Sequence, residues 1–161
     1  MPEACSWKAA HFWVHNTREH FEYTLKVPAD CSCAFSAGEN FYRKTYKSQD
    51  SAFIYIDDYV IPFTFPRQIA EKYGPNANVK IIGTDTLVVS GQDSTGRCWK
   101  IIRNKYVVYG YWNVQPKDKA KFETALSSVQ FRVDSKYSEK KNELAKNKKG
   151  FDYIEFKCRR F

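Results

Sequence analysis

Apolar and polar residues alternate along most of the first third of the chain. The alternating segments are Ala9–Asn16, Phe21–Val27, Phe41–Lys47 and Ala52–Ile56. A period of two is typical of strands that bury one face and expose the other. The segment between the second and third of them, Ala29–Asn40, lacks this period, and we expect a loop there. The pattern therefore predicts that the first third is mostly sheet.

A helical pattern interrupts the alternation once in the middle of the chain. Phe65–Tyr73 carries Pro66 at a position suited to a first helical turn, and Gly74-Pro75 follows as a stop signal. Three more strands are then expected as a meander, at Val79–Ser90, Cys98–Arg103 and Tyr106–Val114. The glycine-flanked segment Gly91–Gly96 should link the first two as a hairpin.

The period changes to that of a helix near the end of the main pattern. Pro116–Gln130 places Phe122, Leu126 and Val129 on one stripe, which predicts a long amphipathic helix packed across the sheet. Ser135–Lys149 is also helix-like but has few apolar positions, and Phe151–Phe156 resembles an edge strand. The expected fold class is α+β, with a mainly antiparallel sheet packed by one long amphipathic helix and shorter helices. We expect one domain over residues 1–133, with residues 134–161 as a basic helical and strand appendage of it.

Composition excludes two classes of protein. The chain has 161 residues, of which 43% are apolar and 17% aromatic, too hydrophobic a mixture for a disordered chain. No apolar run reaches the ~20 residues of a membrane-spanning helix, so we expect no transmembrane segment. The many Tyr and Phe residues favour strands and also supply material for a binding surface.

Positive charge is concentrated at the C-terminal end. The formal net charge is +8, and residues 134–161 contribute half of it, with 9 basic and 5 acidic residues. Such a segment attracts nucleic acid, anionic membrane or an acidic protein through long-range potential. A solvated, lysine-rich helix over Lys136–Lys149 would explain the same letters without any partner.

The order of the predicted elements resembles that of a known family. A strand ending in proline (Phe21–Pro28) is followed by more strands, a short helix, a meander and an amphipathic helix that runs into Ser128-Val129-Gln130-Phe131. This order, over about residues 20–132, resembles the PsbP-like α/β/α sandwich family. The resemblance implies an antiparallel sheet between helices and a non-enzymatic role as an assembly or binding factor, often after export. The basic tail and the Cys31-x-Cys33 pair depart from the family pattern, and no functional residue is carried over.

Five cysteines, Cys5, Cys31, Cys33, Cys98 and Cys158, bear on the compartment. Their spacing lacks the paired C-x-x-C knuckles of a zinc site, and the pairing of any disulfides stays open. Residues 1–5 have neither the basic start nor the apolar stretch of a signal peptide. We expect an exported protein, periplasmic or secreted, if a leader has been removed, in which case Cys5 could carry a lipid anchor. Otherwise we expect a cytoplasmic one.

Residues that suggest catalysis or metal binding fail on spacing or context. His11 and His15 lie on a predicted strand, where ~3.3 Å per residue separates them by roughly 13 Å, and His20 lies further on. A dyad of Cys31 or Cys33 with His20 has no supporting local motif. Asp57 and Asp58 are adjacent and should point to opposite faces. Gly91–Gly96 lacks the Gly-Lys-Ser/Thr ending and the following helix of a phosphate loop. We therefore predict no cofactor, no metal and no catalytic residue.

Basic and aromatic residues interleave in two segments. Arg43, Lys44 and Lys47 alternate with aromatic residues in Phe41–Lys47, and a second run extends from Trp99 and Lys100 to Tyr106. Such interleaving is used in macromolecular recognition, although a sheet with one charged face gives the same letters. The predicted binding residues are Arg43, Lys44, Lys47, Trp99 and Lys100.

These observations predict a non-catalytic macromolecule-binding module. Its expected partner is another protein, acidic in charge, and its expected role is that of an accessory or an inhibitor or immunity-type protein. Basic charge would speed the encounter and aromatic anchors would supply affinity. A protein that binds single-stranded nucleic acid is the alternative, and an enzyme with an unrecognised site is the third reading.

Overall fold

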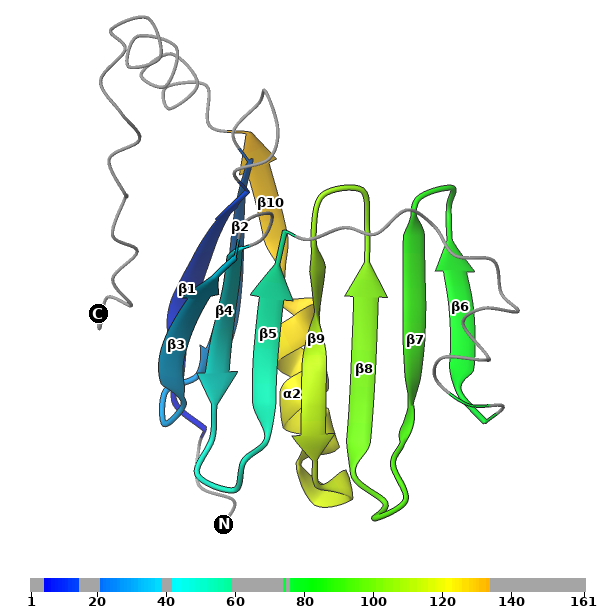
Figure 1. Cartoon of the computed structure of the whole chain (residues 1–161). Helices are drawn as coiled ribbons and strands as arrows, with labels where there is room; N and C mark the ends of the chain where they lie inside the picture. The colour runs from blue at the N-terminus through cyan, green and yellow to red at the C-terminus, as the bar shows by residue number, and fades with distance from the viewer. Residues whose placement is uncertain (1–4, 15–20, 39–41, 59–73, 75, 134–161) are drawn as a thin grey trace, which may run out of the picture.

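An antiparallel sheet of seven strands forms the frame of the molecule. The computed structural model describes residues 5–14, 21–38, 42–58, 74 and 76–133, and every structural statement below refers to these residues. The strands lie in the order β3-β4-β5-β9-β8-β7-β6 (Figure 1). Their bounds are Ser32–Ala37 (β3), Tyr42–Lys47 (β4), Phe53–Asp57 (β5), Asn78–Ile82 (β6), Thr86–Gln92 (β7), Cys98–Arg103 (β8) and Val108–Val114 (β9).

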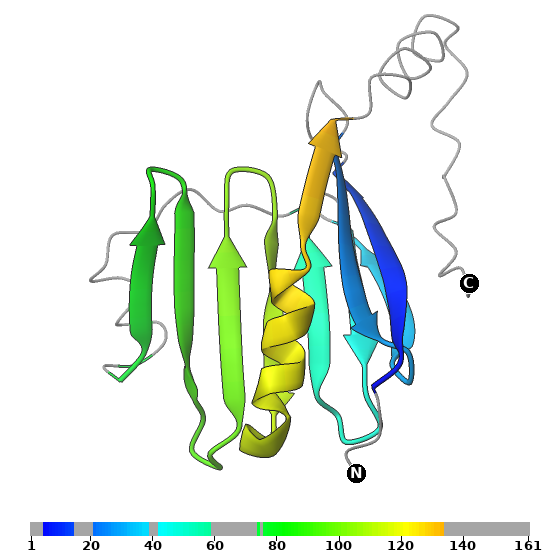
Figure 2. The same cartoon turned by 180° about the vertical axis from the view of Figure 1, so that it is seen from behind.

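A second, three-stranded antiparallel sheet lies over one end of the first. It consists of β1 (Trp7–Val14), β2 (Phe21–Pro28) and β10 (Gln130–Val133), with β2 in the middle. Alternation along β2 turns Phe21, Tyr23 and Leu25 toward the larger sheet. In Figure 1 the small sheet lies behind strands β3, β4 and β5, and in Figure 2, seen from the opposite side, it lies in front of them.

One short helix covers the middle of the larger sheet. A 3-10 turn at Pro116–Asp118 leads into α2 (Lys119–Ser127), which packs against β2 and β9. Figure 2 shows α2 in front of β9, with no described element in front of β6, β7 and β8. We call the face of the larger sheet that meets α2 and the small sheet its inner face, and the opposite one its outer face. The covered half is β3, β4, β5 and β9, and the uncovered half is β6, β7 and β8.

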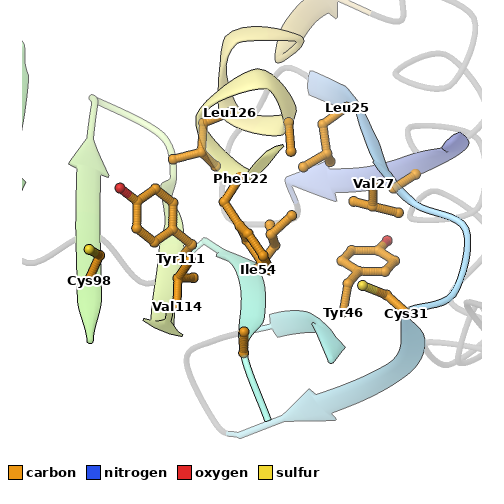
Figure 3. Packing of buried hydrophobic residues seen from close by; sticks show 13 residues of the cluster. Leu25, Val27, Cys31, Tyr46, Ile54, Cys98, Tyr111, Val114, Phe122 and Leu126 are labelled. Carbon is orange, nitrogen blue, oxygen red and sulfur yellow. The ribbon is translucent and has the colours of Figure 1, made fainter. Parts of the chain in front are cut away.

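Most of the core lies on the inner face of the covered half. Figure 3 shows Phe122 reaching from α2 toward Ile54 of β5, and its ring meets that of Tyr111 at a centroid distance of 5.9 Å. Burying such side chains is the main favourable term in folding. Two adjoining clusters make up this inner core: Ala10, Leu25, Val27, Cys31, Tyr46, Ala52, Ile54, Cys98, Tyr111, Val114, Phe122, Ala125 and Leu126, and then Phe12, Val14, Phe21, Tyr23, Ile56 and Val107.

A smaller core lies on the outer face of the uncovered half. Leu87 and Val89 of β7 and Trp99 and Ile101 of β8 form it, and all four are buried. Ala77, just before β6, packs against them. One continuous sheet therefore buries apolar residues on both of its faces, at different ends.

The expected α+β fold class is wrong, because the described residues are mostly strand and contain one short α-helix. The helix predicted over Pro116–Gln130 ends at Ser127, where the Ser128 hydroxyl donates to the Ala125 carbonyl and accepts the backbone N–H of Lys26. Residues 130–133 then pair with β2. Pairing with a neighbouring strand has overridden a helical period in this segment. The predicted helices at Phe65–Tyr73 and Ser135–Lys149 and the strand at Phe151–Phe156 lie outside the described residues.

Two boundaries within the sheet were also predicted wrongly. Half of the loop expected over Ala29–Asn40 is β3, Ser32–Ala37, which is paired to β4 along its length. The strand expected over Val79–Ser90 is two strands, β6 and β7, because the chain turns at Gly83 with a φ of +62°. The hairpin between β7 and β8 is confirmed.

Candidate protein-binding face

The period of strand β4 divides the predicted basic residues between two faces. Arg43 and Lys47 point to the outer face and are exposed, whereas Lys44 points inward and is buried. Consecutive side chains of a strand point to opposite sides, so the run Arg43-Lys44 cannot act as one patch. The structure therefore places Arg43 and Lys47 on the same face, roughly 13 Å apart along β4, and places Lys44 on the opposite one.

Lys44 has an internal role in this arrangement. Its Nζ donates a hydrogen bond of 2.7 Å to the backbone carbonyl of His11 in β1. Burial lowers the pKa of Lys44, because removing the ammonium from water disfavours its charged form. Lys44 thus ties the larger sheet to the smaller one.

Arg43 is held in a fixed orientation on the outer face. Its Nη2 and Nε donate to Asp57 Oδ2 at 2.7 and 3.0 Å. Its guanidinium also lies 5.6 Å from the ring centroid of Tyr55, within the range of a cation–π contact. The Arg43 side chain is still 47% exposed while Asp57 is buried. Because its geometry is set before any partner arrives, Arg43 would lose little conformational entropy on binding.

Aromatic rings continue the outer face beside Arg43. Phe53 and Tyr55 of β5 lie with ring centroids 6.3 Å apart, and Phe53 faces Trp112 of β9 across the strand pair. All three side chains are partly exposed. We call the set Arg43, Lys47, Phe53, Tyr55 and Trp112 the aromatic–basic face.

The other two predicted binding residues lie elsewhere. Trp99 is buried on the outer face of β8, where its ring stacks on Trp112 at 5.3 Å. Lys100 points inward and donates to Glu123 Oε2 of α2 at 2.6 Å. Strands β4 and β8 are three strand spacings apart, about 14 Å. Trp99 therefore packs beside Trp112 at the border of the aromatic–basic face, and Lys100 is not part of this face.

The sequence reasoning missed Phe53, Tyr55 and Trp112. The alternation in Phe53–Ile56 does carry the signal, because the two isoleucines are fully buried and the two aromatic residues beside them must point the other way. The face on which Trp112 lies could not be predicted from the sequence, since a bulge in β9 shifts the register of this strand against β8.

The remaining candidate residues serve structural roles. Asp58 accepts the backbone N–H of Tyr42 at 2.7 Å, and Asp57 holds Arg43, so the acidic pair does not share a site. His11 Nδ1 lies 2.6 Å from Glu22 Oε1, whose other oxygen accepts a hydrogen bond from Arg132. His15 and His20 lie outside the described residues. Among the described residues, no group of three or more His, Cys, Asp or Glu side chains could hold a metal ion.

The four cysteines within the described residues fall into two states. Cys5, Cys31 and Cys98 are free thiols, and Cys33 is disulfide-bonded. Burial and the nearby Asp30 raise the pKa of Cys31 to about 11, which makes it a poor nucleophile at neutral pH. The raised pKa of Cys31 therefore gives no support to a catalytic pair of Cys31 and His20.

Comparisons with known proteins add no further assignment. No family model, curated protein or solved structure matches the chain. The resemblance to the PsbP-like family stays a prediction. Within the described residues, no helix has both the length and the apolar character required to cross a membrane.

Proposed function

We propose that the chain is a non-catalytic protein-binding module that holds an acidic partner with its aromatic–basic face. The observation that carries this proposal is the row formed by Arg43, Tyr55, Phe53 and Trp112 on one face of the sheet. Arg, Tyr and Trp are the residue types that most often dominate binding energy at protein interfaces.

The surroundings of this row suit a docking surface. Its neighbours on β3 are small and exposed, with Ser32, Ala34 and Ser36 on the same face. The neighbouring strand therefore adds no large side chain that would stand in the way of a flat partner. The net charge of +8 would attract an acidic protein and raise the rate of encounter.

A charge reversal at Lys47 is the direct test. Lys47→Glu should lower the amount of partner that the immobilised protein captures from an extract of its own cells, measured by quantitative mass spectrometry. The matched control is Lys26→Glu, because Lys26 is also exposed on a strand but belongs to the three-stranded sheet. Equal capture by both variants and the parent would show that this face is the wrong one. Lys44 is unsuitable for such a test, since its reversal would bury a carboxylate.

Tyr55→Ala separates protein binding from the second candidate function. Half-exposed rings beside cations are also what single-stranded nucleic acid uses for base stacking and phosphate contact. A fluorescently labelled thymidine oligonucleotide is titrated at two salt concentrations. Affinity that falls steeply with salt, and falls again in Tyr55→Ala, would assign the face to nucleic acid. No binding to the oligonucleotide leaves the acidic protein as the partner.

We also propose that the protein works in an oxidising compartment, as an exported one does. The disulfide at Cys33 supports this, because such bonds are rare in the cytosol. Thiol counting on protein denatured without reductant tests it. Of five cysteines, three are free in the described residues, so fewer than five reactive thiols are expected. Five reactive thiols in protein taken directly from its source cells would contradict the proposal.

A further inference from the structure

Strand β6 is the last strand of the larger sheet and leaves one edge open. It pairs with β7 on one side, and no described residue pairs with its other side. All five of its residues are exposed. Val79, Ile81 and Ile82 are exposed by 40%, 53% and 49%. An edge of this kind presents unpaired backbone N–H and C=O groups together with apolar side chains.

The apolar layer on the outer face of the uncovered half continues onto β6, where its side chains are exposed. On the outer face, Val79 faces Val89 and Ile81 faces Leu87 across the β6–β7 pair. Val89 and Leu87 are buried, whereas their partners on β6 are in solvent. A further strand beside β6 would continue the layer and cover both exposed side chains.

Few of the usual protective features are present on β6. Natural edge strands are commonly guarded by several charges, a proline or a bulge. Strand β6 carries one charge, Lys80, and neither a proline nor a register shift. The opposite edge strand, β3, exposes mainly Ser and Ala, with Phe35 as its one large apolar residue, stacked on Tyr42. The two edge strands of the sheet therefore differ, and β6 exposes more apolar side chain for a further strand to pack against.

We propose that β6 pairs antiparallel with β6 of a second copy of this chain, around a two-fold axis through Ile81. A two-fold interface must be self-complementary, because each residue meets the symmetry-related surface. With Ile81 at the centre, its side chain faces the same side chain of the other copy. Val79 lies diagonally across from it, within reach for packing on the same face.

Charge favours the register centred on Ile81 over the register centred on Lys80. Pairing centred on Lys80 would place two lysines directly opposite each other, which destabilises a strand pair. Centred on Ile81, Lys80 instead lies beside Ile82 of the other copy, and its aliphatic stem can cover that exposed side chain. The two seven-stranded sheets then form one continuous sheet, with their outer-face cores joined.

The dimer should be weak and should depend on concentration. With the axis through Ile81, only Lys80, Ile81 and Ile82 of each five-residue strand lie opposite β6 of the other copy, and so short a pair buries far less than the roughly 800 Å² per partner of a standard stable interface. Sedimentation velocity of the full chain from about 10 μM to about 1 mM should therefore show a monomer that converts to a dimer. A chain that stays monomeric over this range overturns the proposal and leaves the edge to a foreign strand.

Charge at the centre of the pair should abolish the dimer. Ile81→Lys places two ammonium groups opposite each other, and we expect the dissociation constant to rise at least about tenfold. Val79→Lys serves as a second variant, and thermal unfolding checks that both remain folded. The matched control is Phe131→Lys on β10, because Phe131 is equally exposed at 54% and lies on the other sheet. A dimer that survives both β6 substitutions, or is lost in Phe131→Lys alone, contradicts the proposal.

Engineered cysteines report the register directly. Under mild oxidation Ile81→Cys should give a disulfide-linked dimer on a non-reducing gel, since the Cα atoms of directly opposed residues lie about 4.5–5.5 Å apart, within the range that a disulfide spans. Lys80→Cys should not cross-link to itself, and the parent chain controls for its own free thiols. Efficient cross-linking of Lys80→Cys instead of Ile81→Cys would overturn the proposed register.

Discussion

In the covered half of the larger sheet, Tyr46, Ile54 and Ile56 point inward to α2 and the small sheet. In the uncovered half, Leu87 and Trp99 point outward, and the inner face carries mostly residues that are partly or fully exposed. The polar residues on that inner face are Asn78, Lys80, Thr86, Ser90, Gln92 and Lys100. The buried side of the sheet therefore changes between its two ends.

Strand β9 lies where this change occurs. It gives Tyr111 to the inner core and Trp112 to the outer one. A register shift against β8 lies beside these residues, and Asn113 adopts a φ of +60°. A bulge changes the local twist and re-aims side chains, so a single sheet can serve two cores. The difference teaches that alternation defines a strand but does not say which of its faces is buried. In the covered half, α2 and the small sheet bury the inner face.

Removing Phe122 should have the largest effect, because it fills the centre of the inner core. Phe122→Ala should lower the free energy of unfolding by about 3–5 kcal/mol, the usual cost of truncating a buried phenylalanine. Urea denaturation followed by tryptophan fluorescence measures it. Phe131→Ala is the matched control, since Phe131 is mostly exposed, and it should cost far less. Equal losses would contradict the view that the covered half holds most of the stability.

Gly110 tests the junction of the two halves. A Cβ at this position would lie 1.9 Å from the carbonyl oxygen of Lys100 in β8. Because backbone cannot move aside cheaply, Gly110→Ala should cost about 3 kcal/mol. At Gly91 the added Cβ would meet only the ring of Trp99, at 2.8 Å, and Gly91→Ala should cost less. Chemical denaturation of both variants measures the two losses in unfolding free energy. A larger loss in Gly91→Ala than in Gly110→Ala would show that β8 and β9 are not closely packed at the junction.

Much of the strand pattern could be predicted from the sequence. The period of two located β1, β2, β4, β5, β8 and β9 to within a few residues. It failed where tertiary pairing had to be known, as in Ser32–Ala37 and Gln130–Val133, which become strands through β4 and β2. It also failed to split β6 from β7, although Gly83-Thr84-Asp85-Thr86 interrupts the apolar run with residues typical of a turn.

The candidate site was less predictable than the fold. Arg43 and Lys47 could be found from the letters, but alternation should have excluded Lys44 from the same face. The same alternation places Trp99 and Lys100 on opposite faces, but which of them faces inward depends on where α2 packs, because Lys100 points toward Glu123 of that helix. Trp99 was placed on a strand correctly, yet its partner Trp112 lies on another strand, in a pairing set by the fold.

High pH should destabilise the fold through buried tyrosines in the covered half and in the small sheet. Burial raises the pKa of Tyr23 from 10.0 to about 12, and it also raises the pKa values of Tyr46 and Tyr111. A folded-state pKa above the unfolded one means that stability is intact below pH 10 and falls as pH rises toward 12. For Tyr23 this fall is about 2–3 kcal/mol.

The alkaline fall is measured as the free energy of unfolding against pH. Tyr23→Phe should make the fall between pH 10 and 12 shallower, because one buried phenol is removed. Lys44 works in the opposite direction, since its lowered pKa makes stability rise as pH approaches 10.5. An identical slope in Tyr23→Phe and the parent would show that Tyr23 is not protected by burial.

The smallest effect should come from the ion pair that joins α2 to the uncovered half. Lys100 Nζ and Tyr111 Oη donate to the two carboxylate oxygens of Glu123, at 2.6 and 2.8 Å. A double-mutant cycle with Lys100→Met and Glu123→Gln should give a coupling of about 0.5–1 kcal/mol, as expected for a partly exposed pair. The amide introduced by Glu123→Gln keeps an acceptor for Tyr111, so the cycle isolates the charge.

The pH dependence of that coupling separates charge from packing. Burial alone would raise the pKa of Glu123, but the hydrogen bonds from Lys100 and Tyr111 lower it below 4.5. A lowered carboxyl pKa gives stability that is present above pH 4.5 and is lost as pH falls through the folded-state value. Repeating the cycle at neutral pH and in acid should therefore show the coupling disappear in acid. A coupling that persists there would mean that Lys100 holds β8 to α2 by the packing of its aliphatic stem, and that the uncovered half needs no charge to stay attached.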